Sequence, residues 1–373
     1  MNWFFHMPVK IVFGSGIKER LKDTINEFGF KKGVLICDPV FIENGCAENI
    51  LQISDGILNS VFSNITANPT TDNADGCAEY LRFAQAEFAV ALGGGSAIDC
   101  AKAACAIAKS NASIRAYHTG GNTLNKETGI PLIVMPTTAG TGSEVTSVSV
   151  LTDTEKKKKA PLGSPCLYPS VALIDPTFTL SVPGKVTAST GLDVISHALE
   201  GFWSVHHQPV CDALAISAAK TAFEYLPEAY DNPSDLNARE KMCEASLLAG
   251  IAFSHPKTSG PHACSFPLTN VYGLPHGEAC AFTLDTFIMI NASAENGRLH
   301  TFAKACGFGS ACDMADTVRR LKKLFGMPST LAEAGIAECD IERLSLDSMH
   351  PNMLNNPVQM DVKAVEKVYR TIG

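Results

Sequence analysis

The chain has 373 residues, of which 46 % are hydrophobic and 18 % charged, and its 30 Lys and Arg against 38 Asp and Glu give a formal net charge of −8. This charge argues against nucleic-acid and anionic-membrane partners, and the length suggests about two domains at ~150 residues each. No apolar run approaches the roughly 18 residues of a membrane span, and the first ten residues lack the basic region of a signal peptide. We therefore expect a cytoplasmic protein.

Thirteen cysteines are scattered between Cys37 and Cys339, and the closest two are Cys100 and Cys105. Without a Cys-x-x-Cys pair, this spacing fits neither a zinc ribbon nor a redox dithiol. An odd number of cysteines and no targeting segment also argue against a disulfide framework. The sequence predicts reduced thiols that pack as small buried hydrophobic groups.

Short apolar runs alternate with helical periodicity through the first half of the chain. After a first strand, Ile17, Leu21, Ile25 and Phe28 fall on one face of a helix. Strands that are apolar on both faces and separated by helices are typical of a parallel sheet covered by helices. The predicted strands are Lys10–Phe13, Gly33–Cys37, Ser60–Phe62, Phe88–Leu92, Pro131–Met135 and Val171–Ile174.

Strand patterns largely disappear from about Ser189 onward. We place an α/β domain at residues 1–180 and an all-helical domain at residues 181–373, and we expect ligands in the cleft between them. The helical segments predicted for the second domain include Ala213–Tyr225, Ala238–Phe253, Leu299–Cys306 and Met314–Phe325.

A glycine-rich turn follows the predicted strand Phe88–Leu92 and leads into a helix that starts near Ser96. Glycines let backbone N–H groups approach a phosphate, and the helix N-terminus adds unpaired donors. The turn lacks the Gly-x-Gly-x-x-Gly fingerprint, so a plain tight turn is the alternative. A second loop at residues 136–146, rich in glycine and hydroxyl side chains, follows another strand. Two such loops at the carboxyl ends of parallel strands favour a dinucleotide site.

Asp38 ends the predicted strand Gly33–Cys37 and precedes Pro39. A carboxylate at this place can accept hydrogen bonds from the adenosine ribose hydroxyls and would repel a 2′-phosphate, which favours NAD over NADP. An Asp-Pro pair also initiates turns. The spacing alone does not decide between these two roles.

Asp193 and His197 stand four residues apart, where one oxygen and one nitrogen on the same helix face can converge on a cation. The alternative is a capping contact, because Thr190 and Asp193 resemble a capping box. Two more imidazoles, His262 and His276, each follow a proline that favours a helix boundary. One Asp and three His suit Fe²⁺ or Zn²⁺, whereas Mg²⁺ and Ca²⁺ prefer oxygen ligands.

Four segments in this order closely resemble the iron-dependent (group III) alcohol dehydrogenases. They are Gly-Gly-Gly-Ser-Ala-Ile-Asp-Cys-Ala-Lys, Pro-Thr-Thr-Ala-Gly-Thr-Gly-Ser-Glu-Val-Thr, Gly-Leu-Asp-Val-Ile-Ser-His-Ala-Leu-Glu and Pro-His-Gly-Glu-Ala. The resemblance implies a Rossmann-like NAD-binding domain, a helical metal and substrate domain, and a homodimer. It further implies one divalent metal, Fe²⁺ first with Zn²⁺ and Mn²⁺ as alternatives, held by Asp193, His197, His262 and His276.

The same resemblance implies a set of contacts to NAD(H). Lys159 belongs to a lysine run, Lys156–Lys159, that is otherwise expected on a solvated hairpin turn, but it matches the family's cofactor-contacting lysine. The implied contacts are Asp38, Asn68, Gly94, Gly95, Ser96, Thr137, Thr138, Thr141, Val150, Lys159 and Thr179.

The chain departs from the common family pattern at Phe266. Many members carry a histidine there, four residues after the third metal ligand, that is assigned to proton relay. Proton delivery in this chain would therefore use another group: His207, the ribose hydroxyls or solvent. The sequence does not choose among these three.

Lys257 and Thr258 lie a few residues before the ligand His262. Most lysines are simply exposed, but beside a metal ligand a lysine and hydroxyl donors could hold a tetrahedral oxyanion. The surrounding pattern, Lys-Thr-x-x-Pro-His-Ala-x-Ser-(Phe/Tyr)-Pro-Leu-Thr, looks like the branch of the family that reduces sulfoacetaldehyde or phosphonoacetaldehyde. We therefore expect NADH-dependent reduction of a short anionic aldehyde, with sulfoacetaldehyde to isethionate as the first choice.

Four alternatives stay open. Three are enzymes: a phosphonoacetaldehyde reductase, a dehydrogenase of 1,2-propanediol, 1,3-propanediol or simple alcohols, and a sister enzyme on the same fold, such as a glycerol dehydrogenase or a maleylacetate reductase. The complete Asp and His set argues against the glycerol dehydrogenase, which uses fewer histidines. The fourth is a non-catalytic scaffold, which the intact ligand set disfavours.

Overall fold

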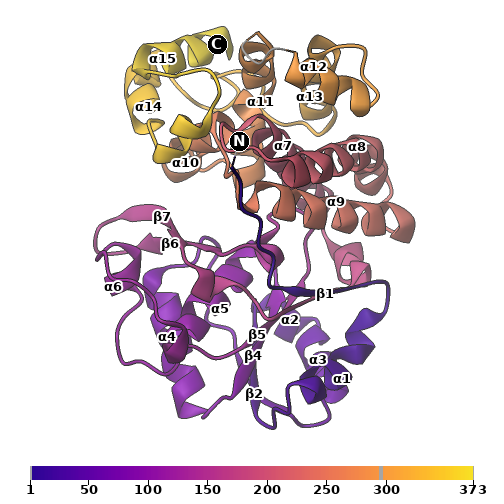
Figure 1. Cartoon of the computed structure of the whole chain (residues 1–373), viewed down its shortest axis with the longest axis vertical. Coiled ribbons are helices and arrows are strands. Elements are labelled where there is room, and N and C mark those ends of the chain that lie inside the picture. Colours follow the sequence, from indigo (N-terminus) through magenta and orange to yellow (C-terminus); the bar gives the residue numbers. More distant parts are fainter. Residues whose placement is uncertain (1, 294–296, 373) are drawn as a thin grey trace. The chain divides into compact units, whose positions relative to one another are not determined.

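The computed structural model describes residues 2–293 and 297–372. The chain divides into two compact units (Figure 1). The sheet unit comprises His6–Thr138 and Ser143–Leu180, and the helical unit comprises Met1–Phe5, Ala139–Gly142 and Ser181–Gly373. None of the helices in the described ranges has the length and apolar character needed to cross a membrane.

A six-stranded parallel sheet forms the centre of the sheet unit, with strand order β1-β8-β5-β4-β2-β3. Every residue of β2 and β4 is buried, as expected for central strands covered on both faces. All six predicted strands are confirmed, with ends that differ by two residues at most. The strands are β1 (Lys10–Phe13), β2 (Gly33–Cys37), β3 (Leu58–Phe62), β4 (Phe88–Gly93), β5 (Leu132–Pro136) and β8 (Val171–Ile174).

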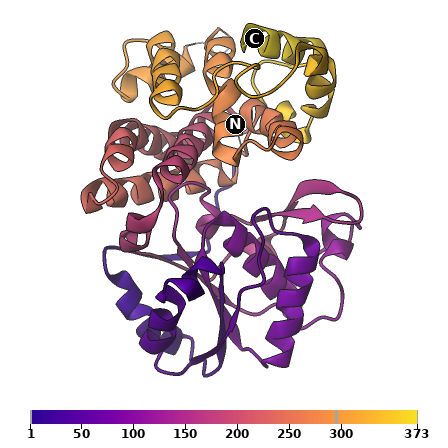
Figure 2. The ribbon, with the colours of Figure 1, turned by 180° about the vertical axis from the view of Figure 1, so that it is seen from behind.

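Helices cover both faces of this sheet (Figures 1 and 2). Residues of α1 (Leu21–Glu27) and α3 (Cys46–Ile53) form one core with alternate strand residues such as Leu35 and Val90. The longer helices α4 (Thr71–Phe83) and α5 (Gly95–Ala106) pack together on the other face. The remaining short helices and 3-10 turns are η1 (Ile17–Arg20), α2 (Val40–Glu43), α6 (Arg115–His118), η2 (Lys126–Thr128), η3 (Ser143–Val145), η4 (Pro165–Leu167) and η5 (Pro176–Ser181).

An antiparallel hairpin stands apart from the main sheet. It joins β6 (Val148–Asp153) to β7 (Lys158–Gly163). The predicted hairpin turn is confirmed, but Lys158 and Lys159 belong to β7 itself. β7 was not predicted because its sequence, Lys-Lys-Ala-Pro-Leu-Gly, has no apolar alternation and includes a proline.

The helical unit contains the expected series of helices, and each predicted segment lies in one of them, apart from the last residue of two segments, Cys306 and Phe325. Two of its helices begin at the predicted proline boundaries before His262 and His276. The elements are α7 (Gly184–Trp203), α8 (Pro209–Asp231), α9 (Leu236–Ser254), α10 (Gly260–Tyr272), α11 (His276–Ala292), α12 (Arg298–Ala305), α13 (Ala311–Leu324), η6 (Glu338–Asp340), α14 (Ile341–Asp347), η7 (Pro351–Asn355) and α15 (Val362–Ile372).

Helix α7 is the central helix of this unit. From Thr187 to Trp203 all of its residues except Thr190 are buried, as expected of a helix packed on all sides. Because α7 begins at Gly184, Thr190 and Asp193 are both interior, so the capping-box alternative is wrong. The Thr190 hydroxyl instead donates to the Val186 carbonyl.

All thirteen cysteines are free and nine of them are buried, so the prediction of packed thiols is confirmed for these nine. The main core of the helical unit includes Cys264 and Cys306 among its aliphatic and aromatic residues. Such thiols behave as small hydrophobic side chains. One buried thiol, Cys280, has a different environment that is described below.

Helix α11 packs so closely on α7 that a side chain at Gly277 would clash. An added Cβ would lie 1.9 Å from the Ser189 carbonyl oxygen. We therefore predict that Gly277→Ala forces α11 away from α7 and lowers the free energy of unfolding by about 1–3 kcal/mol. Denaturant unfolding measures the change.

The matched control is Gly76→Ala in α4, where an added Cβ meets nothing within 4 Å. Alanine favours a helix by about 1 kcal/mol over glycine, so this variant is expected to be as stable as the parent or more so. A Gly277→Ala protein with unchanged stability would contradict the close packing of α7 and α11.

Candidate metal centre and cofactor site

Three helices bring the four predicted metal ligands together. Asp193 and His197 lie on α7, His262 lies on α10, and His276 is the first residue of α11. The Nε2 atoms of His197 and His262 are 3.0 Å apart, and Asp193 Oδ1 is 3.5 Å from His262 Nε2. The ring centroids of His262 and His276 are 5.3 Å apart. These separations suit atoms that share one ion.

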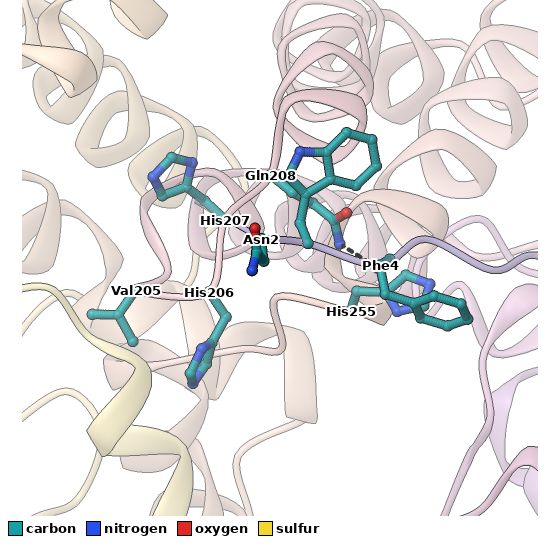
Figure 3. A pocket seen from close by; sticks show the side chains of 8 residues that line it. Asn2, Phe4, Val205, His206, His207, Gln208 and His255 are labelled. Carbon is teal, nitrogen blue, oxygen red and sulfur yellow. Dashed lines mark hydrogen bonds between the residues drawn. The ribbon is translucent and has the colours of Figure 1, made fainter.

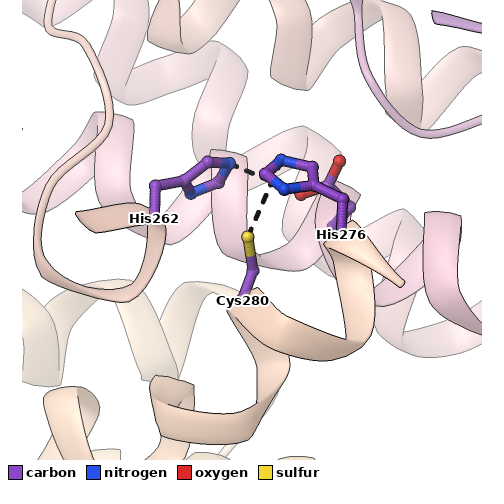
Figure 4. A group of neighbouring side chains, drawn as sticks. His262, His276 and Cys280 are labelled. Carbon is purple, nitrogen blue, oxygen red and sulfur yellow. Dashed lines mark hydrogen bonds and ion pairs between the residues drawn. The ribbon is translucent and has the colours of Figure 1, made fainter. Parts of the chain in front are cut away.

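A fifth side chain, Cys280, joins this group (Figure 4). One ligand atom from each of Asp193, His262, His276 and Cys280 lies within 4.8 Å of the others, and three of these residues are buried. The sulfur of Cys280 is 3.9 Å from His276 Nε2. Cys280 was not predicted as a ligand from the sequence, although its position four residues after His276 on one helix is a signal that could have indicated it.

The protonation states of Asp193 and His197 favour the binding of a cation. Burial opposes ionisation of Asp193, but the neighbouring His197 and His276 rings hold its pKa well below its ordinary value. Its Oδ1 atom is buried and accepts no hydrogen bond from the described residues. Burial lowers the pKa of His197 to about 4, which leaves a neutral ring with a free lone pair. A buried carboxylate oxygen without a donor is the kind of group that a cation satisfies.

Glu200, one turn after His197, orients His262. Its Oε1 atom is 2.5 Å from His262 Nδ1, and its Oε2 atom accepts a hydrogen bond from the Ser259 backbone N–H. Burial alone would raise the pKa of Glu200, but the His262 ring lowers it, so the carboxylate is ionised. A carboxylate at Nδ1 places the ring proton there and leaves Nε2 to bind a metal. Glu200 belongs to the sequence motif that contains Asp193 and His197, but the sequence alone predicted no role for it.

One oxygen, three imidazoles and a thiol fit a divalent ion such as Fe²⁺ or Zn²⁺. Nitrogen and sulfur donors favour these ions, and Mg²⁺ and Ca²⁺ favour oxygen donors. The unsatisfied Asp193 oxygen and the oriented His262 ring both agree with a metal in this place.

The glycine-rich turn of the sheet unit lies against Asp38. Helix α5 begins at Gly95, and a Cβ at Gly93 would lie 2.6 Å from Asp38 Oδ2. Burial raises the pKa of Asp38, against the effect of a hydrogen bond from the Gly94 backbone. The Asp38 carbonyl also accepts a turn hydrogen bond from Phe41. Asp38 therefore initiates a turn and also directs its carboxylate toward the glycine-rich turn.

The second loop meets the first at two threonines. The Thr137 backbone N–H donates to the Gly93 carbonyl at 3.0 Å, and Thr138 Oγ1 lies 3.3 Å from the place of a Cβ on Gly94. Ser96, also predicted to contact NAD(H), lies in the first turn of α5. The two loops therefore lie against each other at the carboxyl ends of β4 and β5.

Two side chains from α5 hold the stretch from Ser143 to Val150. Asp99 accepts hydrogen bonds from the Ser143 hydroxyl at 2.6 Å and the Val150 backbone at 2.8 Å. The ammonium of Lys102 donates to Ser143, Thr146 and the Val148 carbonyl. Burial lowers the pKa of Lys102 to about 8. Both residues stand in the glycine-rich motif, but the sequence alone predicted no role for either of them.

The remaining residues that were predicted to contact the cofactor lie in three places. Lys159 Nζ donates to Asn68 Oδ1 at 2.8 Å, and Asn68 has a left-handed backbone with φ 57°. Thr179 is buried in η5, where its hydroxyl donates to the Pro176 carbonyl. Thr141 belongs to the stretch Ala139–Gly142 of the helical unit.

Comparisons with known proteins agree with both halves of this arrangement. The family described as "Iron-containing alcohol dehydrogenase" matches residues 8–176, and its C-terminal counterpart, "Fe-containing alcohol dehydrogenase family, C-terminal", matches residues 187–373. The chain belongs to the iron-containing alcohol dehydrogenase family.

Relatives of this iron-containing alcohol dehydrogenase act on different substrates. An NAD-dependent methanol dehydrogenase from Bacillus methanolicus is 32 % identical, over 91 % of this chain and 92 % of the relative. A 1-propanol dehydrogenase from Salmonella typhimurium is 37 % identical, over 82 % of this chain and 78 % of the relative. The solved structure of sulfoacetaldehyde reductase from Bifidobacterium kashiwanohense in complex with NAD⁺ is 47 % identical, with a TM-score of 0.97 and coverage of 100 % of this chain and 99 % of that one.

Two predicted substrate residues of this iron-containing alcohol dehydrogenase lie between α9 and α10. Lys257 is exposed, with φ 67°, and its Nζ donates to the Ser254 carbonyl at the end of α9. Neighbouring protein atoms desolvate the ammonium and lower its pKa. Thr258 is buried, and its Oγ1 accepts a hydrogen bond at 2.8 Å from Asn352 of η7.

His207 lies in a different group of side chains. Its Nδ1 is 3.1 Å from Asp212 Oδ2, and the ring lines a pocket with the N-terminal residues Asn2, Trp3 and Phe4 (Figure 3). None of the five clustered side chains lines that pocket. A proton-transfer role for His207 therefore stays a prediction.

Phe266 lies on α10, one turn after His262, and its ring packs on His350, with centroids 4.4 Å apart.

The contact between Glu200 and His262 gives a testable prediction for the family's metal. In Glu200→Gln, the amide oxygen would accept from Ser259 and the NH₂ group would face His262 Nδ1, which moves the ring proton to Nε2. We predict about 10–100-fold weaker Zn²⁺ binding. Competition with a chelating dye measures this affinity.

The control for this variant is Glu244→Gln on α9, which removes only a surface ion pair with Lys241. Zn²⁺ affinity is expected to be unchanged in the control. Parent-like affinity in Glu200→Gln would show that this carboxylate does not orient a metal ligand.

Proposed function

We propose that this protein catalyses the NADH-dependent reduction of a short anionic aldehyde to its alcohol, with sulfoacetaldehyde to isethionate as the best candidate reaction. The observation that carries the proposal is the likeness to a sulfoacetaldehyde reductase, which is 47 % identical over the whole chain. Identity to the methanol and 1-propanol dehydrogenases is lower, at 32 % and 37 %.

We assign the metal to the helical unit and the cofactor to the sheet unit. Asp193, His197, His262 and His276 would hold the divalent metal. When bound, the metal supplies Lewis-acid polarisation of the carbonyl group, and the nicotinamide supplies the hydride. Asp193 contributes a negative charge that balances part of the positive charge of the ion. Glu200 keeps His262 in the tautomer that can bind it.

The two loops of the sheet unit would bind NADH. Backbone N–H groups at the N-terminus of α5 would bind the pyrophosphate, because Gly93 and Gly94 have no side chain that would block it. The Asp38 carboxylate at the end of β2 would accept hydrogen bonds from the ribose hydroxyls and repel a 2′-phosphate. Lys159 and Asn68, already joined to each other, would contact the same cofactor.

Lys257 and Thr258 would recognise the anionic end of the substrate. The Lys257 ammonium uses one of its donors on Ser254, which leaves two for a sulfonate. Thr258 Oγ1 accepts from Asn352, so its own hydroxyl proton is available to donate. Ser259, the next residue, donates to Glu200 and ties this segment to the metal centre.

Three groups are candidates for the proton donor of the alcohol product. Phe266 has no acidic proton, so His207, a cofactor ribose hydroxyl or solvent would supply it. The active protein is expected to be a homodimer, as the family resemblance implies.

An uncharged aldehyde is the second candidate substrate, because the 1-propanol dehydrogenase is 37 % identical. We predict that anaerobically purified, metal-replete protein has its highest kcat/KM for sulfoacetaldehyde among four compounds. The others are phosphonoacetaldehyde, propionaldehyde and 3-hydroxypropionaldehyde, and NADH oxidation is the readout. A preference for either uncharged aldehyde would reject the proposed substrate class, and no turnover of any compound would favour a scaffold.

A variant of Lys257 tests how the anion is recognised. A hydrogen bond to a charged group contributes about 1.5–3 kcal/mol, so Lys257→Ala is expected to lower kcat/KM for sulfoacetaldehyde about 10–100-fold. Turnover of propionaldehyde should change little, since that substrate has no anion to bind. Steady-state kinetics with both aldehydes measure the difference.

The control is Lys363→Ala, which removes an exposed lysine on α15 and should affect neither substrate. Equal losses for the charged and the uncharged aldehyde in Lys257→Ala would mean that the lysine supports the local fold and not the anion.

A further inference from the structure

Cys280 differs from the other buried cysteines in what surrounds its sulfur. It lies on α11 one turn after His276 and is fully buried. Its sulfur is 3.9 Å from His276 Nε2 and belongs to the group, within 4.8 Å, that includes an oxygen of Asp193 and a nitrogen of His262 (Figure 4). It is the one such group of possible ligands found in the described residues.

The surroundings of the sulfur are polar and converge on one point. Three helices contribute to the group: α7 through Asp193, α10 through His262, and α11 through His276 and Cys280. The buried Asp193 Oδ1 lacks a hydrogen-bond donor among the residues described. A thiol that served only as packing would be expected among aliphatic side chains, as for Cys306 in the main core.

We propose that Cys280 is a ligand of the metal centre, so that sulfur joins the oxygen of Asp193 and the imidazoles in binding the ion. This inference rests on the metal-dependent function proposed above and adds a ligand to it. On binding, the S–H proton leaves to solvent as the bond from sulfur to metal forms, and no oxidation takes place. The thiolate and Asp193 together balance the two positive charges of the ion.

A sulfur ligand has consequences for metal choice. Thiolate is a soft donor that favours Zn²⁺, Fe²⁺ and Co²⁺ over Mg²⁺ and Mn²⁺. The ligand pair His276 and Cys280 stands at i and i+4, so one turn of α11 supplies two donors. Metal binding should therefore depend on α11 more strongly than if Asp193 and the three histidines were the only ligands.

The first test uses Co²⁺, because a thiolate bound to this ion gives a charge-transfer absorption band in the near ultraviolet. We expect the band in the parent loaded with Co²⁺ and its loss in Cys280→Ser and Cys280→Ala. The matched control is Cys306→Ala at the end of α12, a buried thiol whose Sγ donates to the Ile216 carbonyl and does not belong to the group of possible ligands. Persistence of the band in Cys280→Ala, or its absence in a parent that binds one equivalent of Co²⁺, would overturn the proposal.

The second test needs no variant and so does not depend on whether the substitutions fold. X-ray absorption spectroscopy of the parent loaded with Zn²⁺ is expected to show one sulfur neighbour at about 2.3 Å, beside nitrogen and oxygen neighbours at about 2.0–2.2 Å. A shell of nitrogen and oxygen alone would reject Cys280 as a ligand.

The two proposals fail separately. If the spectra show no sulfur but the protein still reduces sulfoacetaldehyde, only the ligand role of Cys280 is lost. If sulfur is present and no aldehyde in the panel is reduced, only the proposed function is lost.

Discussion

The hydrogen bonds of the Glu200 carboxylate are the constraint on which the metal centre depends. This fully buried group accepts from Ser196 on its own helix and from the Ser259 backbone at the start of α10, and it contacts His262. A buried carboxylate without these partners would be costly, so the segments must stay together for the charge to be tolerated. The same contacts that make burial possible fix the direction of the His262 ring.

The strands could be predicted from sequence because the main sheet is buried on both faces. Runs such as Gly33–Cys37 and Phe88–Leu92 have no polar face, and the turns around them carry Gly, Asp and Pro. The β6–β7 hairpin is outside that sheet, and β7 has neither apolar alternation nor β-branched residues, so local sequence gave no sign of it as a strand. Helix ends next to prolines, as before His262 and His276, were also predictable.

The site was predictable only in part. The spacing of Asp193 and His197 suggested a cation, and the imidazoles of His262 and His276 completed a possible ligand set. Only the family resemblance assigned all four to one metal, because contacts between distant segments leave no local pattern. Cys280 was hidden among thirteen cysteines whose common role is packing. Glu200 and Asp99 were hidden for another reason: each acts through the residues that it positions, and no short motif describes that.

The attachment of residues 143–150 to α5 affects how a dinucleotide would bind. Asp99 and Lys102 hold this stretch from the helix whose N-terminus forms the glycine-rich turn, and Thr137 holds the neighbouring loop to Gly93. These hydrogen bonds form within the sheet unit and need no ligand, so the proposed binding surface would be ordered beforehand. Little backbone entropy would be lost on binding, so more of the contact energy would remain as affinity. Asp99 and Lys102 would therefore favour cofactor binding, although neither is predicted to contact the cofactor.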